Sequence, residues 1–354
     1  MARIVVAGAG ATGASIAYHL ALQGASEVVL ADRGEIAGGA TGKAMGGIRQ
    51  QFSTAAEVRL TQQSIRFFEE LGPPFFDQVG YLFLATSADG FAALEERREL
   101  QAGLGVPVEQ LDPAEAEALA PGIFSGDVVG AVICREDGVA DPPAVAAELV
   151  RLAGDLGVEL REHTSAEQLD ADIRVLACGA YSAEAAARHG VDLPVRPLCR
   201  QLFETTAMEG IPDGLPMVLE AESGFHFRRR GDTLRVAMPD PEPRWGFEET
   251  VDESLLPDRL ERLAHRFPAA SSTQVGRTWA GLYDMTPDAH PIIGFVEDGL
   301  YAACGFSGHG FMQSPAVGRA VAEEVLHGAS SFDLSPYRLE RFSAGAVFPE
   351  EVIL

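Results

Sequence analysis

The chain has 354 residues, a hydrophobic share of 47% and a formal net charge of −25 at pH 7. This length suggests two domains or one domain with a large insertion, and the hydrophobic share is ample for a core. So acidic a surface argues against nucleic acid and anionic membranes as partners, and no apolar run approaches the length of a membrane-spanning helix.

The N-terminus and the cysteines give no sign of export or metal binding. The first apolar run begins at Ile4 and leads directly into a glycine turn, unlike a signal peptide, so we expect a cytoplasmic location. No C-x-x-C pair occurs, so the sequence predicts neither a metal site nor a redox dithiol. We expect free thiols at Cys134, Cys178, Cys199 and Cys304.

The first elements form a dinucleotide-binding pattern. An apolar run at residues 4–7 leads into a G-x-G-x-x-G sequence made by Gly8, Gly10 and Gly13. An amphipathic helix is expected at residues 14–22, and a second strand at residues 28–30 ends beside Asp32. The glycines permit a tight turn, the helix N-terminus attracts phosphates, and the carboxylate accepts from ribose hydroxyls. The motif alone leaves NAD and FAD both open.

A glycine-rich stretch at residues 34–47 follows and contains Lys43, the only lysine among 27 basic residues. A lysine that survives such a bias toward arginine suggests a need for a compact ammonium group. Chance is the alternative explanation for a single residue.

The rest of the chain alternates between helices and strands. Helices are expected at residues 55–71, 91–104, 113–120, 142–156, 255–267 and 314–326. Strands are expected at residues 81–85, 128–134, 158–160, 173–177 and 300–303, and strands joined by hairpins at 195–237.

Strand-rich insertions interrupt the parallel pattern twice. We predict a discontinuous nucleotide domain built from residues 1–78, 141–193 and 274–354. The predicted second domain consists of residues 79–140 and 194–273.

The run CGFSGHGF, residues 304–311, stands between the last predicted strand and helix. Its glycines leave backbone N–H groups free to face a ligand, and the helix that follows adds its dipole. Such a turn suits the anionic edge of a flavin. An ordinary tight turn is the alternative.

Several motifs together resemble one family. They are GAGATGASIAYHLALQG, GGATGKAMGGIRQQF, GYLFLAT, EDGVADP, ACGAYSAE, AGLYDMTPDAHPIIG and CGFSGHGFMQSPAVG. The chain resembles FAD-dependent oxidoreductases of the D-amino-acid-oxidase superfamily, in the branch of sarcosine oxidase, dimethylglycine oxidase and the proline dehydrogenase β-subunit. The resemblance implies an α/β fold, with a Rossmann-like FAD-binding domain of the GR2 type. It also implies an α+β substrate domain on a mainly antiparallel sheet.

The resemblance also implies that the dinucleotide is FAD. By this resemblance the cofactor-binding residues are Gly8, Gly10, Ala11, Thr12, Gly13, Asp32, Arg33, Ala40, Thr41, Lys43, Gly46, Gly47, Ile48, Ala166, Cys178, Gly179, Gly281, Gly305, Gly308, His309, Gly310, Phe311 and Met312. Gly281 stands where monomeric sarcosine oxidases carry the cysteine that links FAD, and no histidine lies between His19 and His163. We therefore predict noncovalent FAD.

Four catalytic or substrate-binding residues follow from the same resemblance: Arg49, Tyr283, His226 and Met312. Arg49 is expected to bind a substrate carboxylate through its guanidinium fork. Tyr283 and His226 are expected in the substrate pocket, although core packing is an alternative for each. Met312 stands where monomeric sarcosine oxidases have a lysine, and Arg235 stands where they have the oxygen-activating lysine, so the resemblance leaves both O2 and another electron acceptor open.

We predict FAD-dependent oxidation of the C–N bond of an amino acid or N-alkyl amino acid by hydride transfer to flavin N5, giving an imine that hydrolyses. The expected partners are a small-molecule amine, O2 or another electron acceptor, and a partner subunit or a second copy of the chain. One alternative is a flavin dehydrogenase for a non-amine such as a hydroxy acid. A second is an electron-relay subunit of a larger amine dehydrogenase, and a third is an NAD dehydrogenase.

Overall fold

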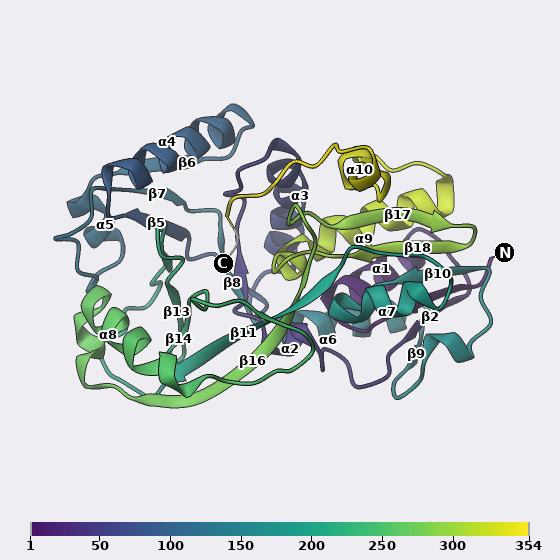
Figure 1. Ribbon diagram of the computed structural model, residues 1–354, viewed down its shortest axis with the longest axis horizontal. Helices are drawn as coiled ribbons and strands as arrows, with labels where there is room; N and C mark the ends of the chain where they lie inside the picture. The colour runs from purple at the N-terminus through teal and green to yellow at the C-terminus, as the bar shows by residue number, and fades with distance from the viewer. Residues whose placement is uncertain (1, 353–354) are drawn as a thin grey trace.

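In the computed structural model, which describes residues 2–352, a six-stranded sheet forms the centre of the lobe that holds the N-terminus (Figure 1). Its order is β17-β18-β10-β1-β2-β9, with only the edge strand β17 antiparallel to its neighbour. The strands are β1 (Ile4–Ala7), β2 (Val28–Ala31), β9 (Glu159–Arg161), β10 (Ile173–Leu176), β17 (Ile292–Glu297) and β18 (Leu300–Cys304). The central strands are short apolar runs because helices and loops cover both faces of the sheet.

Helices α1 (Ala11–Leu22), α6 (Pro142–Asp155) and α9 (Gly310–His327) cover one face of this sheet, and α3 (Ala55–Leu71) packs outside them against α9. Helices α1 and α9 approach closely where Gly318 meets Ser15. A Cβ atom at Gly318 would lie 2.2 Å from the Ser15 hydroxyl, so only glycine permits this contact. On the other face lies α7 (Ser182–Ala187).

The second lobe is built on a nine-stranded sheet in the order β15-β11-β14-β13-β12-β5-β7-β6, with β16 also paired to β11. All its pairs are antiparallel except β5 with β12. The strands are β5 (Tyr81–Ala85), β6 (Val108–Leu111), β7 (Gly130–Cys134), β11 (Arg196–Thr205), β12 (Met217–Glu220), β13 (His226–Arg230), β14 (Thr233–Ala237), β15 (Arg244–Trp245) and β16 (Val275–Met285). Helices α5 (Pro113–Leu119) and α8 (Leu256–Arg266) bury one face, while α4 (Ala88–Gly103) covers part of the other.

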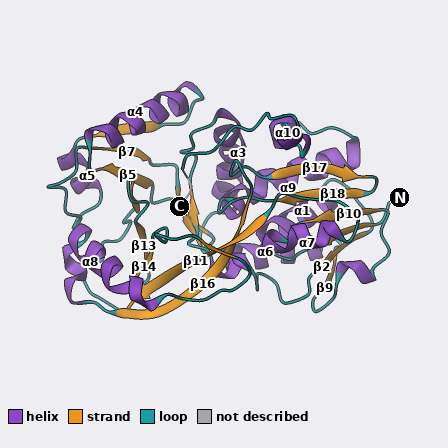
Figure 2. Cartoon of the chain, in the orientation of Figure 1, coloured by secondary structure: helices purple, strands orange, loops and turns teal. Residues whose placement is uncertain are grey.

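A small three-stranded sheet and two long strands connect the two lobes. A three-stranded sheet of β3 (Gly47–Ile48), β8 (Gly138–Ala140) and β4 (Phe76–Asp77) lies between them. The long strands β11 and β16 run from one lobe to the other (Figures 1 and 2). The remaining helices are α2 (Ala40–Lys43), α10 (Glu340–Ser343) and the 3-10 turns η1 (Ala166–Gln168), η2 (Gly179–Tyr181), η3 (Glu253–Leu255), η4 (Pro268–Ser272) and η5 (Ser335–Tyr337).

The last described residues return to the middle of the molecule. After α10 the segment drawn in yellow passes α3 and reaches the region between the two lobes by residue 352 (Figure 1). We call residues 346–352 the C-terminal segment.

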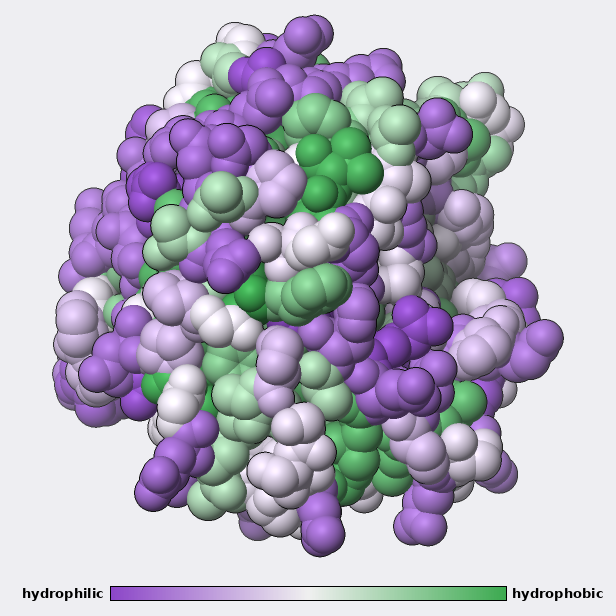
Figure 3. Space-filling view, turned by 90° about the vertical axis from the view of Figure 1, so that its left-hand side faces the viewer, coloured by the Kyte–Doolittle hydropathy of each residue, from purple (hydrophilic) through white to green (hydrophobic). Residues whose placement is uncertain are grey.

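The outer end of the nine-stranded lobe shows a mixed surface, on which hydrophilic residues surround smaller hydrophobic groups (Figure 3). Within residues 2–352, none of the helices combines the length and the apolar character that a membrane crossing requires. All four cysteines are free.

The expected fold class is confirmed, and short elements such as α2, β3, β4, β6 and β8 come in addition to the predicted ones. The last long helix begins at Gly310 instead of Ser314, because glycines that signalled a turn occupy its first turn and its N-cap region. Strands β16 and β17 were not expected as separate strands. The predicted domain boundary at residue 274 stays a prediction, and β16 beyond it pairs with β11 of the nine-stranded sheet.

Candidate functional site

A cavity of about 740 Å³ opens between the two large sheets. It is lined by the glycine turn after β1, the end of β2, helix α2, the inner face of β11 and β16, and the start of α9. Segments from both ends of the chain therefore meet around one space.

The turn between β1 and α1 requires its glycines. Gly8 has φ +105°, and a Cβ atom there would lie 2.3 Å from the carbonyl oxygen of Ala177. A Cβ atom at Gly13 would lie 1.8 Å from the carbonyl oxygen of Gly8, so Gly13 serves the packing of α1 and does not line the cavity. The chain can thus bring its backbone close to a ligand at Gly8 and Gly10.

Asp32 is oriented by the same turn. Its carboxylate accepts from the backbone N–H of Ala9 at 2.6 Å and from that of Gly34 at 2.7 Å. The N-cap of α1, Gly10, has no side chain to cap the first turn, so the positive end of α1 faces the cavity. This end of the cavity fits a dinucleotide, with phosphates at the helix and a ribose at Asp32.

The glycine-rich stretch at residues 34–47 packs against the glycine turn that precedes α1. The hydroxyl of Thr41 in α2 accepts from the N–H of Ala11 at 3.0 Å. Lys43 forms an ion pair with Glu249, and both side chains line the cavity. Gly281 on β16 lies against Lys43, where a Cβ atom would come 2.9 Å from the lysine Cβ.

At the other end of the cavity, the turn before α9 packs under Tyr283. A Cβ atom at Gly308 would lie 2.4 Å from Cε2 of the Tyr283 ring. Asp284 holds this turn by accepting from the N–H of Gly305 at 2.7 Å, and burial raises the pKa of Asp284 to about 6. The N-cap of α9, His309, makes no side-chain cap, so this helix also presents its positive end to the cavity.

Arg49 is fully buried beside the cavity and has no carboxylate partner among residues 2–352. Its guanidinium lies 4.1 Å from the centre of the Phe52 ring and donates to the carbonyl oxygens of Gln51 and Val352. Its Nε–H has no acceptor in this part of the chain. A buried, unpaired guanidinium favours an anionic ligand.

His226 faces the cavity from β13 as a neutral imidazole. Burial, together with the charges of Arg49 and Arg200, lowers its pKa to about 4. Nδ1 lies 2.7 Å from the carbonyl oxygen of Gly224 and donates to it, so Nε2 carries the free lone pair. His226 can therefore accept a hydrogen bond from an N–H group.

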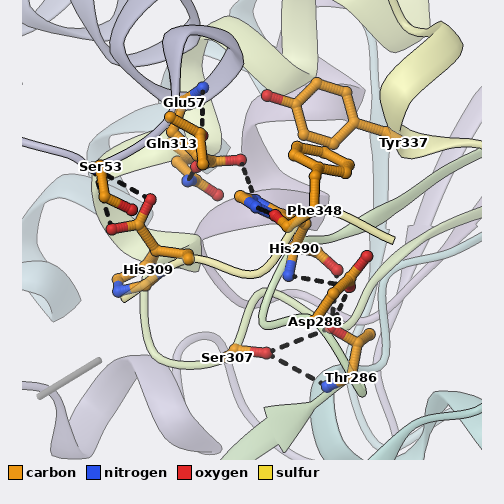
Figure 4. A network of polar contacts seen from close by, with 12 residues as sticks. Ser53, Glu57, Thr286, Asp288, His290, Ser307, His309, Gln313, Tyr337 and Phe348 are labelled. Carbon is orange, nitrogen blue, oxygen red and sulfur yellow. Dashed lines mark hydrogen bonds and ion pairs between the residues drawn. The ribbon is translucent and has the colours of Figure 1, made fainter. Parts of the chain in front are cut away.

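A buried polar network anchors the C-terminal segment beside Arg49 (Figure 4). His290 donates from Nδ1 to Glu57 at 2.9 Å and from Nε2 to the carbonyl oxygen of Phe348 at 2.6 Å. The Phe348 ring stacks on His290 with a centroid distance of 3.9 Å. Two residues further on, the Glu350 carboxylate accepts from the N–H of Ser53 at 3.0 Å.

Most of the residues predicted from the sequence line this one cavity, including Arg49, Tyr283, His226 and Met312. The exceptions are Gly13, Ile48 and Gly305. Ile48 is buried in the core, with 1% of its surface exposed, and Gly305 packs against Thr286. These residues therefore lie behind the residues that line the cavity. The remaining predicted cofactor residues that line the cavity are Gly8, Gly10, Ala11, Thr12, Asp32, Arg33, Ala40, Thr41, Lys43, Gly46, Gly47, Ala166, Cys178, Gly179, Gly281, Gly308, His309, Gly310 and Phe311.

Sequence reasoning missed Arg200 and the C-terminal segment. Arg200 lies on β11 and lines the cavity, but the alternation of a strand does not tell which face turns inward. The C-terminal segment has no motif, and only the tertiary structure brings it to Arg49.

Comparisons with known proteins agree with this geometry. A family model described as "FAD dependent oxidoreductase" matches residues 3–324. FAD-dependent oxidoreductase domain-containing protein 1 of Bos taurus is 31% identical over 99% of this chain and 87% of its own length. The sarcosine oxidase subunit beta of an Arthrobacter species is 25% identical over 98% of this chain and 92% of its own. The structure of L-proline dehydrogenase from P. horikoshii superimposes with a TM-score of 0.91 at 29% identity, covering 97% of this chain and 98% of that one.

Proposed function

The chain belongs to the family of FAD-dependent oxidoreductases, and on that premise we propose that it oxidises the C–N bond of an amino acid or N-alkyl amino acid. Bound FAD supplies the acceptor for a hydride taken from the carbon next to nitrogen. The imine product then adds water and hydrolyses. Proline and sarcosine, named in the two relatives above, are amines of this class.

The residues of the cavity fit FAD. The glycine turn, Asp32 and the start of α1 suit the ADP half, and the start of α9 suits the pyrimidine edge of the flavin ring. Lys43 suits phosphate or flavin oxygens on the side of Gly281. The assignments of individual residues to FAD follow the resemblance described above.

The unpaired guanidinium of Arg49 beside the neutral imidazole of His226 carries the proposal of an amino-acid substrate. Arg49 binds a carboxylate, which compensates its buried charge. His226 accepts a hydrogen bond from the substrate N–H and so orients the amine nitrogen over the flavin; the neutral amine is the form that can give up a hydride. Tyr283 bounds the same pocket over Gly308 and excludes water.

The test is anaerobic reduction of the flavin-containing protein, followed by its visible absorbance. A panel of amino acids, N-methyl amino acids and 2-hydroxy acids is added in turn. We expect bleaching with at least one amine and none with the hydroxy acids. Bleaching by hydroxy acids alone would favour a flavin dehydrogenase for a non-amine substrate. A colourless protein that takes up no FAD would contradict the proposal that this chain catalyses a flavin-dependent oxidation.

We also propose that the natural electron acceptor is not O2. Arg235, at the place of the oxygen-activating lysine in monomeric sarcosine oxidases, does not line the cavity. The Arg235 guanidinium forms an ion pair with the Glu204 carboxylate at 2.7 Å and donates to the carbonyl oxygen of Ala44 at 2.9 Å.

A cytoplasmic location remains a prediction. A partner subunit or a second copy of the chain also remains a prediction, which the sarcosine oxidase relative supports because it is itself a subunit.

A further inference from the structure

Arg200 is a second cation in the substrate part of the cavity. It lies on β11 directly opposite Gly281 of β16, and opposed residues of an antiparallel pair share a face. Gly281 has no side chain, and the stem of Lys43 packs over it. The central carbon of the Arg200 guanidinium lies 5.7 Å from the centre of the Tyr283 ring.

Within residues 2–352, Arg200 has no ion-pair partner and its Nε–H is buried without an acceptor. Four other arginines with buried side chains pair with carboxylates: Arg235 with Glu204, Arg259 with Asp240, Arg266 with Glu220, and Arg341 with Asp288. Arg228 is buried without an ion pair among the described residues and donates instead to the carbonyl oxygens of Met45 and Ala140. Arg200 and Arg49 are exceptions that face the same cavity.

The acidic side chains near these arginines are engaged elsewhere. Glu249 pairs with Lys43, and Asp284 accepts from the N–H of Gly305. Asp32 lies at the dinucleotide end and accepts from Ala9. Within the described cavity wall, no carboxylate forms an ion pair with Arg200.

Both arginines flank one pocket. Arg49 and Arg200 each lie close enough to His226 to lower its pKa, and each also acts on Tyr283. Two unpaired cations in one poorly hydrated space repel each other and favour a ligand with two negative groups.

We propose that the substrate is an amine with two carboxylates, such as an acidic amino acid or an N-carboxyalkyl amino acid, and that Arg200 binds the second carboxylate. This rests on the proposed function, in which Arg49 binds the first carboxylate. The amine lies between the two, within reach of Nε2 of His226. Arg200 thus determines the preference for dicarboxylate substrates, while the oxidation of the C–N bond is the same as in the proposed function.

The first experiment compares matched substrates in anaerobic reduction of the flavin-containing enzyme. Iminodiacetate is paired with sarcosine, and N-methylglutamate with N-methylglutamine, so that each pair differs in one carboxylate. We expect kcat/KM to favour the dicarboxylate by about 10-fold or more, because a charge-assisted pair with a guanidinium is lost in the other member. Equal or better use of the monocarboxylates overturns the proposal and leaves the proposed amine oxidation standing.

The second experiment removes the cation. In Arg200→Met we expect kcat/KM for the dicarboxylates to fall about 10- to 100-fold, with the monocarboxylates within about 3-fold of their original values. Arg200→Lys should keep part of the preference. The matched control is Arg196→Met on the same strand, because Arg196 is exposed, lies over Trp245 and does not line the cavity. Equal loss for both substrate classes in Arg200→Met overturns the assignment.

A binding measurement separates recognition from turnover. Thiodiacetate and methylthioacetate carry sulfur in place of the amine, and they differ in one carboxylate. We expect thiodiacetate to raise the melting temperature and perturb the flavin spectrum at lower concentration than methylthioacetate, with this advantage lost in Arg200→Met. Failure of every amine to reduce the flavin, with thiodiacetate still favoured, would refute the proposed function but not the two-carboxylate pocket. Equal binding of thiodiacetate and methylthioacetate overturns the proposal that the pocket binds two carboxylates.

Discussion

The carbonyl oxygen of Val352 lies 2.8 Å from Nη2 of Arg49. The same oxygen lies 3.1 Å from Nε2 of His309, so the C-terminal segment fixes the two cavity side chains with one acceptor. Burial and the nearby charge of Arg49 hold the pKa of His309 well below its ordinary value, and the imidazole therefore adds no charge beside Arg49.

Loosening the C-terminal segment should weaken substrate binding. In Phe348→Ala the stack on His290 is lost, and we expect KM for the carboxylate substrate to rise about 10-fold with a smaller change in kcat, because Arg49 must be ordered at the moment of binding. Steady-state kinetics measure the two parameters. Val347→Ala, at an exposed neighbour, is the control. If Phe348→Ala lowers the melting temperature but leaves KM unchanged, the C-terminal segment has a structural role only.

The turn at Gly8 should not tolerate a side chain. Gly8→Ala places a methyl group 2.3 Å from the Ala177 carbonyl oxygen at a φ of +105°. We expect protein that is poor in FAD and melts about 5 °C lower or more, since strain of this kind costs about 1–3 kcal/mol. Flavin content and thermal melting measure this. Gly154→Ala, with open space around its Cβ position in α6, should keep full flavin content.

Flavin should leave the protein on denaturation. Gly281 offers no side-chain atom for a covalent link at the place where related enzymes carry a cysteine. Precipitation with acid should therefore leave a colourless pellet and yellow supernatant. Colour retained in the pellet would identify a linkage through another side chain of the cavity, such as Cys178 or His309.

Reoxidation by O2 should be slow. With the charge of Arg235 compensated by Glu204 outside the cavity, we expect the reduced enzyme to react with O2 at least about 10-fold more slowly than with an artificial acceptor such as a quinone or a phenazine. Stopped-flow mixing of the reduced enzyme with air-saturated buffer and with the acceptor compares the two rates. Fast formation of peroxide would assign the chain as an oxidase.

The contribution of two buried histidines to stability should fall as the pH falls from 6.5 to 4, while Asp137 and Asp284, whose pKa values burial raises to about 7 and about 6, contribute in the opposite direction. Burial lowers the pKa of His19 and of His226 from 6.5 to about 4, so in this window these two side chains bind more protons in the unfolded chain than in the folded chain. Each histidine's contribution is fully present above pH 6.5 and amounts to no more than about 3 kcal/mol. The change in the free energy of unfolding from pH 7 to pH 5, measured in urea, should be more favourable to the folded state in His19→Gln than in the parent protein. His327→Gln, at an exposed site, should match the parent.

The residues predicted for the dinucleotide half of the site lie together in one cavity because their arrangement depends on local backbone. Gly8, Gly10 and Asp32 belong to one strand–turn–helix–strand unit, in which spacing along the chain sets the geometry. The substrate half depends on which face of a strand turns inward and on contacts between distant segments. Arg200 on β11 and Val352 at the chain end reach Tyr283 and Arg49 only through tertiary packing, so no local pattern marks them.

Strands β11 and β16 form a continuous two-stranded ribbon, and residues 200–202 and 281–284 of it make one wall of the cavity. Backbone hydrogen bonds maintain the shape of such a ribbon whichever side chains it carries. Exchange of residues at its inward positions therefore offers a route by which a common catalytic core can be adapted to new amines, while the nucleotide-holding loops on the opposite side stay unaltered.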